Sequence, residues 1–312
     1  KVLVCETIYS SDIKVIKTLS KHTELEIVIV PQSVTTGKTN HADLREILEQ
    51  NSDEFAAIAF PQVNAYGNLE DVNDFIDIAE QNNIISIAMI DPMLIATDGL
   101  TPPSLYGTNK NGSDIIVAEG QHLAIAPNYG GPGLGVLGIR YNQENKTHIR
   151  STAGRFVGKT IDSNNKNVYT IVLSTREQHI RREKATSNIC SNQSFIATLA
   201  GASILARGEE GMRSSCKKGK QDLLYILNNI LKIEGINLAF PNTYFYNEVT
   251  LKIEKDISVL IEDARNSGIH LGVNISFKID PQSNRYLLLS CFDRHSQKDL
   301  DQLIKFFQSE FS

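Results

Sequence analysis

The sequence lacks the features that mark most metal-binding, secreted, membrane and nucleic-acid-binding proteins. Its four cysteines are far apart with no C-x-x-C pair, so neither a zinc site nor a disulfide framework is expected: Cys5, Cys190, Cys216 and Cys291. No apolar run approaches the roughly 20 residues that span a bilayer. The opening residues show no basic stretch before an apolar run, which a secretory signal peptide would have. The formal net charge is -5, whereas nucleic-acid-binding domains usually carry an excess of basic residues. We therefore expect a cytoplasmic protein that binds no metal, membrane or nucleic acid.

What the chain does contain is enough apolar sequence for a large core. It has 312 residues, of which 41% are hydrophobic and 21% are charged, and this length predicts about two domains. The chain begins with Lys1 directly before a strand-like run at 2–5, without an initiating Met. From this start we expect the sequence to be a piece of a longer chain.

The first half of the sequence alternates short apolar runs with helical patterns. The apolar runs predict buried strands at 2–5, 25–30, 56–60, 84–90 and 114–118. The patterns between them predict helices at 11–19, 42–48 and 69–81, the last with Asn68 as its N-cap. This alternation predicts an α/β fold with a mostly parallel sheet. Ligands of such sheets bind at the carboxyl ends of the strands, which here include Glu6, Asp91 and the segments 61–64 and 119–122.

A glycine-rich segment at 128–140 contains Gly133, Gly135 and Gly138 in the G-x-G-x-x-G spacing of dinucleotide-binding loops. That motif requires a strand before it and a helix after it. Here a loop precedes the glycines, and the apolar residues among them predict a strand that runs into Arg140. We therefore interpret the glycines as residues of a tight turn or a close backbone approach.

The most unusual stretch spans residues 176–193, where three arginines, a lysine and a histidine lie among glutamates and asparagines. It stands between a strand-like run at 168–173 and a helical pattern at 193–207. One interpretation is a solvated loop with ion pairs such as Glu177 to Arg181. The other is a binding site or a subunit interface, which the Thr-Ser-Asn run at 186–188 favours.

The remaining sequence predicts a second α/β module. Helical patterns at 193–207 and 212–231 precede two strands, at 248–253 and 286–291, which alternate with helices at 257–264 and 299–311. Ser296 and Asp299 are placed to cap the last helix. We therefore predict a large sheet domain over 1–207, including the charged stretch 176–193, and a small C-terminal α/β domain over 208–312.

Four segments carry a resemblance to a known family. They are Gln178 to Gln193, Gly130-Gly-Pro-Gly133, Asp114 to Gln121 and Arg155-Phe-Val-Gly158. Together they resemble the glycine decarboxylase P-protein, the glycine dehydrogenase (decarboxylating) of the glycine cleavage system, and specifically subunit 1 of its split, two-subunit bacterial form. The resemblance covers essentially the whole chain. It implies the aspartate-aminotransferase-like fold of pyridoxal-phosphate (PLP)-dependent transferases, fold type I, with the upstream part of the large domain missing.

The resemblance also implies a reaction, in which glycine is decarboxylated on PLP and the aminomethyl group passes to the lipoyl group of H-protein. Such chemistry needs a Schiff-base lysine and a carboxylate at the pyridine nitrogen. Asp91 stands where the fold puts this carboxylate, but Gln121 stands where the lysine is expected, and an amide cannot form a Schiff base. The resemblance therefore implies an obligatory subunit without covalent PLP, in a heterotetramer whose subunit 2 carries the cofactor.

No residue of this chain is assigned a catalytic role. Asp91 is interpreted as a vestige of a cofactor site or as a turn residue before Pro92, and His122 as a structural imidazole. The residues expected at the interface or the mouth of a shared active site are His179, Arg181, Arg182, Lys184, Asn188 and Asn192. Two alternatives stay open: a stand-alone PLP-dependent enzyme that uses another lysine, such as Lys159 or Lys184, and a non-catalytic scaffold of the same fold.

Overall fold

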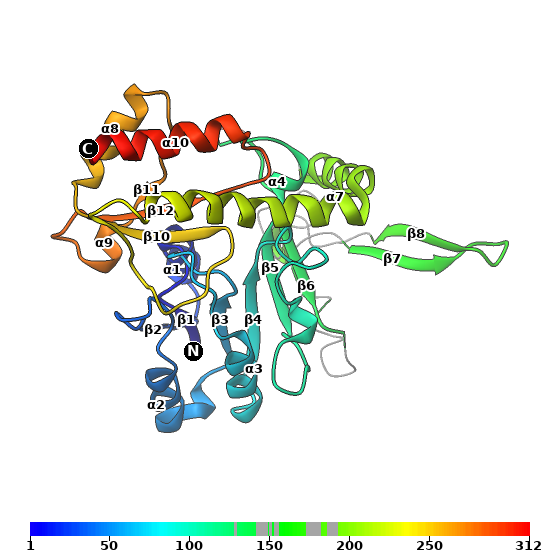
Figure 1. Ribbon diagram of the computed structural model, residues 1–312. Helices are drawn as coiled ribbons and strands as arrows, with labels where there is room; N and C mark the ends of the chain where they lie inside the picture. Colours follow the sequence, from blue (N-terminus) through cyan, green and yellow to red (C-terminus); the bar gives the residue numbers. More distant parts are fainter. Residues whose placement is uncertain (128–129, 142–148, 150–151, 153–155, 173–181, 186–192) are drawn as a thin grey trace. The chain divides into compact units, whose positions relative to one another are not determined.

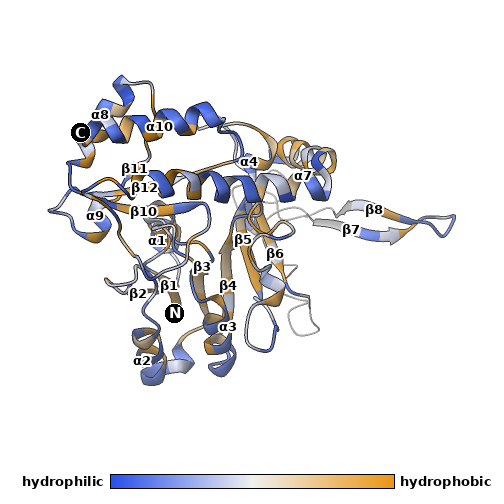
Figure 2. Cartoon of the chain, in the orientation of Figure 1, coloured by the Kyte–Doolittle hydropathy of each residue, from blue (hydrophilic) through white to orange (hydrophobic). Residues whose placement is uncertain are grey.

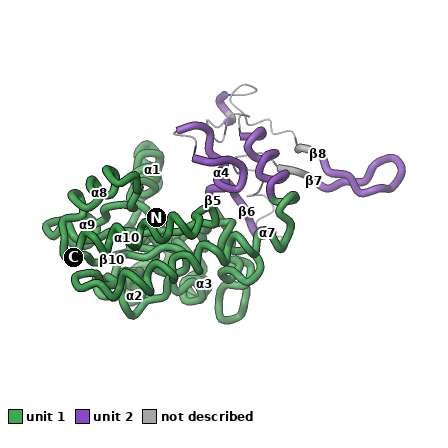
Figure 3. Tube along the Cα trace, turned by 45° about the horizontal axis from the view of Figure 1, so that its top comes forward, with its two compact units in different colours: residues 1–118, 204–312 green, residues 119–203 purple. Residues whose placement is uncertain are grey.

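The computed structural model forms two compact units (Figure 3). The first consists of residues 1–118 and 204–312, and the second of residues 119–203. The described residues are 1–127, 130–141, 149, 152, 156–172, 182–185 and 193–312. The first unit contains four hydrophobic clusters, and the two largest pack on its parallel sheet and around its antiparallel sheet. The division into domains 1–207 and 208–312 stays a prediction.

A parallel sheet organises the first unit (Figure 1). Its strands run in the order β2-β1-β3-β4-β5, with every neighbouring pair parallel. Their bounds are β1 (Val2–Cys5), β2 (Ile27–Val30), β3 (Ala57–Pro61), β4 (Ile85–Ile90) and β5 (Ile115–Glu119). Figure 2 shows β3 and β4 mainly in the colours of apolar residues, as a sheet covered by helices requires. The predicted α/β fold is confirmed.

Helices connect these strands and pack on the sheet. They are α1 (Ser10–Ser20), α2 (His41–Asn51) and α3 (Val72–Gln81), with short 3₁₀ turns at η1 (Ser52–Glu54) and η2 (Pro103–Leu105). Phe60 of β3 and Phe75 of α3 stack with ring centroids 4.3 Å apart, and both side chains are fully buried. The buried apolar side chains of α3 therefore face the sheet.

The predicted start of α3 was wrong. The helix begins at Val72, and its N-cap position is Asp71, whose side chain makes no capping bond. Asn68 lies outside the helix, where its Nδ2 donates to the carbonyl of Thr36 at 3.0 Å. The helical spacing of Leu69 could not show that this residue forms an isolated β-bridge with Val63.

The C-terminal part of the first unit packs a four-stranded antiparallel sheet, in the order β11-β12-β10-β9, against helices. Its elements are the long helix α7 (Gln193–Ile230), which crosses from the second unit, then β9 (Ile236–Leu238), β10 (Glu248–Ile253), α8 (Ile257–Asn266), β11 (Val273–Asn274), α9 (Ser276–Ile279), β12 (Tyr286–Ser290) and α10 (Gln297–Glu310). Gly208, which lies between the helical patterns predicted at 193–207 and 212–231, is a kink with φ 61° inside α7. Ser296 and Asp299 form the predicted capping box of α10.

Within its described residues, the second unit contains a short helix, three strands and a 3₁₀ turn, besides the start of α7. These elements are α4 (Gln121–Ala124), β6 (Gly135–Ile139), β7 (Phe156–Ile161), β8 (Asn167–Val172) and η3 (Arg182–Lys184). Strands β7 and β8 pair antiparallel and form a hairpin. Gly135 and Gly138 lie in strand β6, which confirms that the G-x-G-x-x-G spacing does not open a helix here.

Across the described ranges, no helix combines the length and the apolar character that a membrane span requires. The same residues contain no group of three or more His, Cys, Asp or Glu side chains arranged to hold a metal ion.

Candidate functional site

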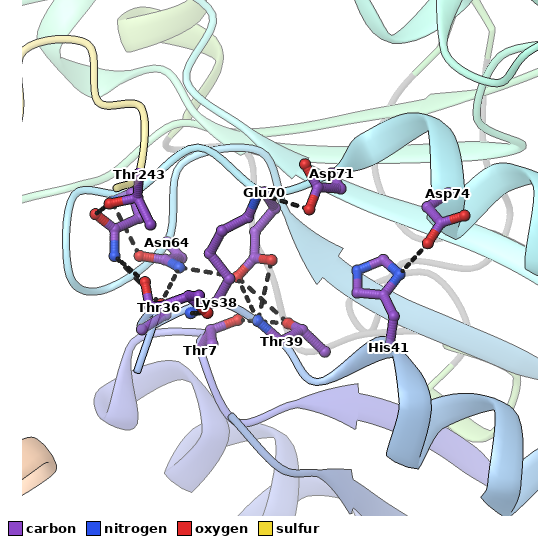
Figure 4. A network of polar contacts seen from close by, with 12 residues as sticks. Thr7, Thr36, Lys38, Thr39, His41, Asn64, Glu70, Asp71, Asp74 and Thr243 are labelled. Atoms are coloured by element: carbon purple, nitrogen blue, oxygen red, sulfur yellow. Dashed lines mark hydrogen bonds and ion pairs between the residues drawn. The ribbon is translucent and has the colours of Figure 1, made fainter. Parts of the chain in front are cut away.

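A buried carboxylate, Glu70, ties together the loops at the carboxyl edge of the parallel sheet (Figure 4). Its side chain accepts hydrogen bonds from Thr39 N at 3.1 Å, from Thr39 Oγ1 at 3.3 Å and from Asn64 Nδ2 at 2.8 Å. Thr7 follows β1, and its hydroxyl oxygen is 3.0 Å from the hydroxyl oxygen of Thr39, within hydrogen-bond distance. Burial raises the pKa of the Glu70 carboxyl, while these hydrogen bonds act against the rise. Segments that follow β1, β2 and β3 thus meet at one side chain.

Asparagines extend this network to the antiparallel half of the unit. Asn64 Nδ2 also donates to the carbonyl of Gly37 at 2.8 Å, and Thr243 Oγ1 donates to Asn68 Oδ1 at 2.9 Å (Figure 4). Asn64 and Asn68 are both buried. Because its donors and acceptors are satisfied by one another, the network is a rigid frame for the sheet edge.

A second group of polar residues lies near Asp91, directly after β4. Asp91 Oδ1 accepts from Met93 N at 2.8 Å, which closes the turn that contains Pro92. The Tyr9 hydroxyl donates to Glu248 Oε2 at 3.0 Å. Burial raises the pKa of the Glu248 carboxyl, and the negative charge of Asp91 raises it further. Burial and the charge of Glu248 also raise the pKa of the Tyr9 hydroxyl. The group can therefore hold a proton on Glu248 or on Tyr9.

Helix α7 adds a thiol and a lysine, which meet the phenol of Tyr246 from the segment before β10, a group that sequence reasoning missed. Cys216 Sγ lies 3.1 Å from Tyr246 Oη, and both side chains are buried. Lys220 Nζ lies 5.0 Å from the centroid of the Tyr246 ring, in cation–π geometry. Burial raises the pKa of the Cys216 thiol, so this cysteine is a neutral packing group. The i,i+4 spacing of Cys216 and Lys220 was the available signal, but it does not reveal Tyr246.

In the second unit, Gln121 has a structural role. Its Nε2 donates to the carbonyls of Ile125 at 3.1 Å and Ala126 at 2.8 Å, and these bonds brace the end of α4. Its backbone N–H donates to Glu119 Oε1 at 2.7 Å.

The glycine motif packs against the same carboxylate. Glu119 Oε1 accepts from Leu134 N at 2.7 Å, so Glu119 links α4 to the glycine-rich segment. A Cβ at Gly133 would lie 2.9 Å from Glu119 Oε2. Gly133 therefore makes room for this carboxylate, the close approach that the sequence suggested.

The residues present do not fit PLP held as a Schiff base at position 121. That bond requires a primary amine, and the Gln121 amide is hydrogen-bonded to two main-chain carbonyls. Lys159 lies on β7 as an exposed residue. Lys184 is the last residue of η3.

The structure describes little of the charged stretch 176–193. Arg182 and Lys184 lie in η3, and the Arg182 side chain is exposed. The other four predicted interface residues lie outside the described residues: His179, Arg181, Asn188 and Asn192. His122 lies in α4. The predicted interface thus stays a prediction.

Known relatives match almost the whole chain. The model of a family described as "Glycine cleavage system P-protein" matches residues 1–307. The protein "Probable glycine dehydrogenase (decarboxylating) subunit 1" of Nitrosospira multiformis is 34% identical over 83% of this chain and 55% of its own length. The protein of that name in Francisella philomiragia is 28% identical over 98% of this chain and 64% of its own. This chain thus spans a little over half to just under two-thirds of these relatives.

Solved structures show the same fold. A glycine decarboxylase (P-protein) of the glycine cleavage system in inhibitor-bound form has a TM-score of 0.82 and 25% identity, over 99% of this chain and 65% of that one. A NifS-like protein from Rickettsia africae has a TM-score of 0.65 and 14% identity, over 99% of this chain and 75% of that one. The predicted PLP-transferase fold, of fold type I, is therefore confirmed. With the family match over residues 1–307, these findings show that the chain belongs to the glycine cleavage system P-protein family.

Proposed function

We propose that this chain is subunit 1 of a split glycine decarboxylase. With subunit 2 it would decarboxylate glycine on PLP and transfer the aminomethyl group to the lipoyl group of H-protein. The relatives named as subunit 1 support this assignment, because they match 83% and 98% of the chain. A cytoplasmic location and a heterotetrameric assembly stay predictions.

The observation that carries the proposal is Gln121 in place of a Schiff-base lysine. Its amide is committed to the carbonyls of Ile125 and Ala126, so the residue braces α4. A chain of this fold without that lysine needs a partner that supplies one. PLP would therefore be held by subunit 2, where it would act as the electron sink for loss of the carboxylate.

In this assembly the chain itself would provide structure and contacts. The Glu70 network holds the carboxyl edge of the sheet rigid, and rigid support is what a shared site requires. Arg182 is exposed on η3 and is available to a partner or to an anionic group at the mouth of the site.

The test is reconstitution from separately purified chains. Subunit 2, lipoylated H-protein and this chain are mixed, and release of CO₂ from glycine is measured. We expect activity from the mixture and none from either subunit alone. Borohydride reduction with PLP should then place one stoichiometric adduct on subunit 2. A stoichiometric adduct on Lys159 or Lys184 would instead establish the stand-alone enzyme.

The interface role of the charged stretch is tested by Arg182→Ala, with Glu183→Ala on the same turn as a matched control. Both side chains are exposed, so each substitution should change the free energy of unfolding by less than about 0.5 kcal/mol. We expect only Arg182→Ala to reduce CO₂ release by the assembled subunits. Unchanged activity in Arg182→Ala would show that this arginine is merely solvated.

A further inference from the structure

The β7–β8 hairpin is a two-stranded ribbon with an ordered turn. Its six pairs run from Phe156 opposite Val172 to Ile161 opposite Asn167. At the tip, Asp162 Oδ1 accepts from Asn164 N at 2.8 Å and from Lys166 N at 2.9 Å. Because the Asp162 carboxylate binds the backbone of its own turn, the shape of the tip does not depend on a partner.

The two faces of the ribbon differ in chemistry. Lys159 lies directly opposite Tyr169, and Ile161 is on the same face because strand residues alternate sides. The Tyr169 side chain is 72% exposed and that of Ile161 is 62% exposed. The opposite face has the exposed Thr160 and Thr170 and the half-buried Val168, and by register it also includes Phe156, Gly158 and Val172. The exposed side chains of the first face therefore include an aromatic, an aliphatic and a cationic group, and those of Thr160 and Thr170 on the other face carry hydroxyl groups.

A ribbon of this kind needs to be covered. An isolated two-stranded hairpin is marginally stable in water, and its unpaired edges and exposed apolar side chains favour association. Within the described residues, β7 and β8 pair only with each other. Tyrosine side chains are also enriched in the cores of protein interfaces.

The size of the ribbon indicates what kind of partner covers it. Six residues extend about 20 Å at 3.4 Å per residue, and two strands with their side chains present roughly 200 Å² on each face. A stable complex buries about 800 Å² per partner. The ribbon can therefore supply one part of a larger contact, as expected between subunits, but not a complete interface. The relatives named as subunit 1 identify a second subunit as the available partner.

We propose that the hairpin is a docking arm whose face with Lys159, Ile161 and Tyr169 binds the lysine-bearing subunit 2. The inference rests on the proposed function, since it requires that partner. The exposed Tyr169 ring inserts into an apolar patch, and Lys159 pairs with a carboxylate or carbonyl at its rim. The Thr160 and Thr170 face stays in solvent.

The test compares the two faces in the full-length chain. Tyr169→Ala and Ile161→Ala remove side chains from the docking face, and Thr170→Ala and Thr160→Ala are matched controls on the opposite face. The dissociation constant for subunit 2 is measured by calorimetry, and circular dichroism checks each fold. We expect Tyr169→Ala to weaken binding by at least about tenfold, as for a buried aromatic anchor. Each control should stay within about twofold of the wild type.

The outcomes distinguish a failure of the docking-arm proposal from a failure of the proposed function. If the wild-type chain binds subunit 2 and Tyr169→Ala binds equally well, the arm is refuted while the proposed function stands. Equal weakening by Tyr169→Ala and Thr170→Ala would refute the assignment of the face. Loss of H-protein binding or of self-association, with subunit 2 affinity intact, would assign the ribbon to another partner and overturn the inference. If the wild-type chain does not bind subunit 2 at all, the proposed function itself fails.

Discussion

Removal of the buried Glu70 carboxylate would test whether the network in Figure 4 holds the sheet edge together. Glu70→Ala leaves Thr39 N–H and one hydrogen of Asn64 Nδ2 without their acceptor. A buried donor without an acceptor costs about 1–3 kcal/mol. Two such donors predict a loss of roughly 2–6 kcal/mol in the free energy of unfolding, a large share of the stability of about 5–15 kcal/mol typical of folded proteins.

The pH dependence of Glu70→Gln separates the charge of the carboxylate from its shape. Burial raises the pKa of Glu70 above 4.5, so the folded chain binds this proton more tightly than the unfolded chain does. The resulting stabilisation is fully present below pH 4.5 and is lost as the pH rises through the folded-state pKa. Glutamine does not titrate and has nearly the shape of the protonated acid. We expect Glu70→Gln to match the wild type at acid pH and to be at least as stable at pH 7.

Urea unfolding followed by circular dichroism measures both effects. Glu49→Ala, an exposed position on α2, provides the control and should change the free energy of unfolding by less than about 0.5 kcal/mol. If Glu70→Ala lost no more than this control, the network would not hold the edge. If Glu70→Gln lost stability steadily from acid pH to pH 7 relative to the wild type, the assigned direction of the Glu70 pKa would be wrong.

Three further predictions concern single positions. Gly219→Ala should lower the free energy of unfolding by about 1–3 kcal/mol, because its Cβ would lie 2.9 Å from the carbonyl oxygen of Cys291; Gly201→Ala, on the same helix with open space around its Cβ, should raise it by about 0.5–1 kcal/mol in urea titrations. Ser296→Ala should cost about 0.5–2 kcal/mol in the same assay, since it removes the capping box of α10, and an unchanged midpoint would contradict this role. The Cys216 thiol, buried with a raised pKa, should resist iodoacetamide in the folded chain at pH 8 and react in urea; rapid native alkylation seen by mass spectrometry would disprove its burial.

The sequence by itself determined the features that depend on local pattern and on residue identity. Buried parallel strands can be recognised in a sequence as apolar runs, because both of their faces are covered. A capping box such as that of Ser296 and Asp299 is complete within four residues, so it can also be recognised from the sequence. That Gln121 carries an amide and not an amine able to form a Schiff base is likewise a matter of identity, since no packing turns an amide into an amine. These features were predictable from the sequence and supported the fold and the subunit assignment.

Only the tertiary structure decided which polar residues meet. Glu70 lies within the helical pattern predicted for α3, yet it is buried against Thr39 and Asn64 because a bridge between Val63 and Leu69 holds the chain outside the helix. Strand β11 has two residues, too few for a pattern, and it exists only through pairing with β12. Long-range pairing and burial depend on residues far apart in the chain, so they cannot be predicted from local periodicity.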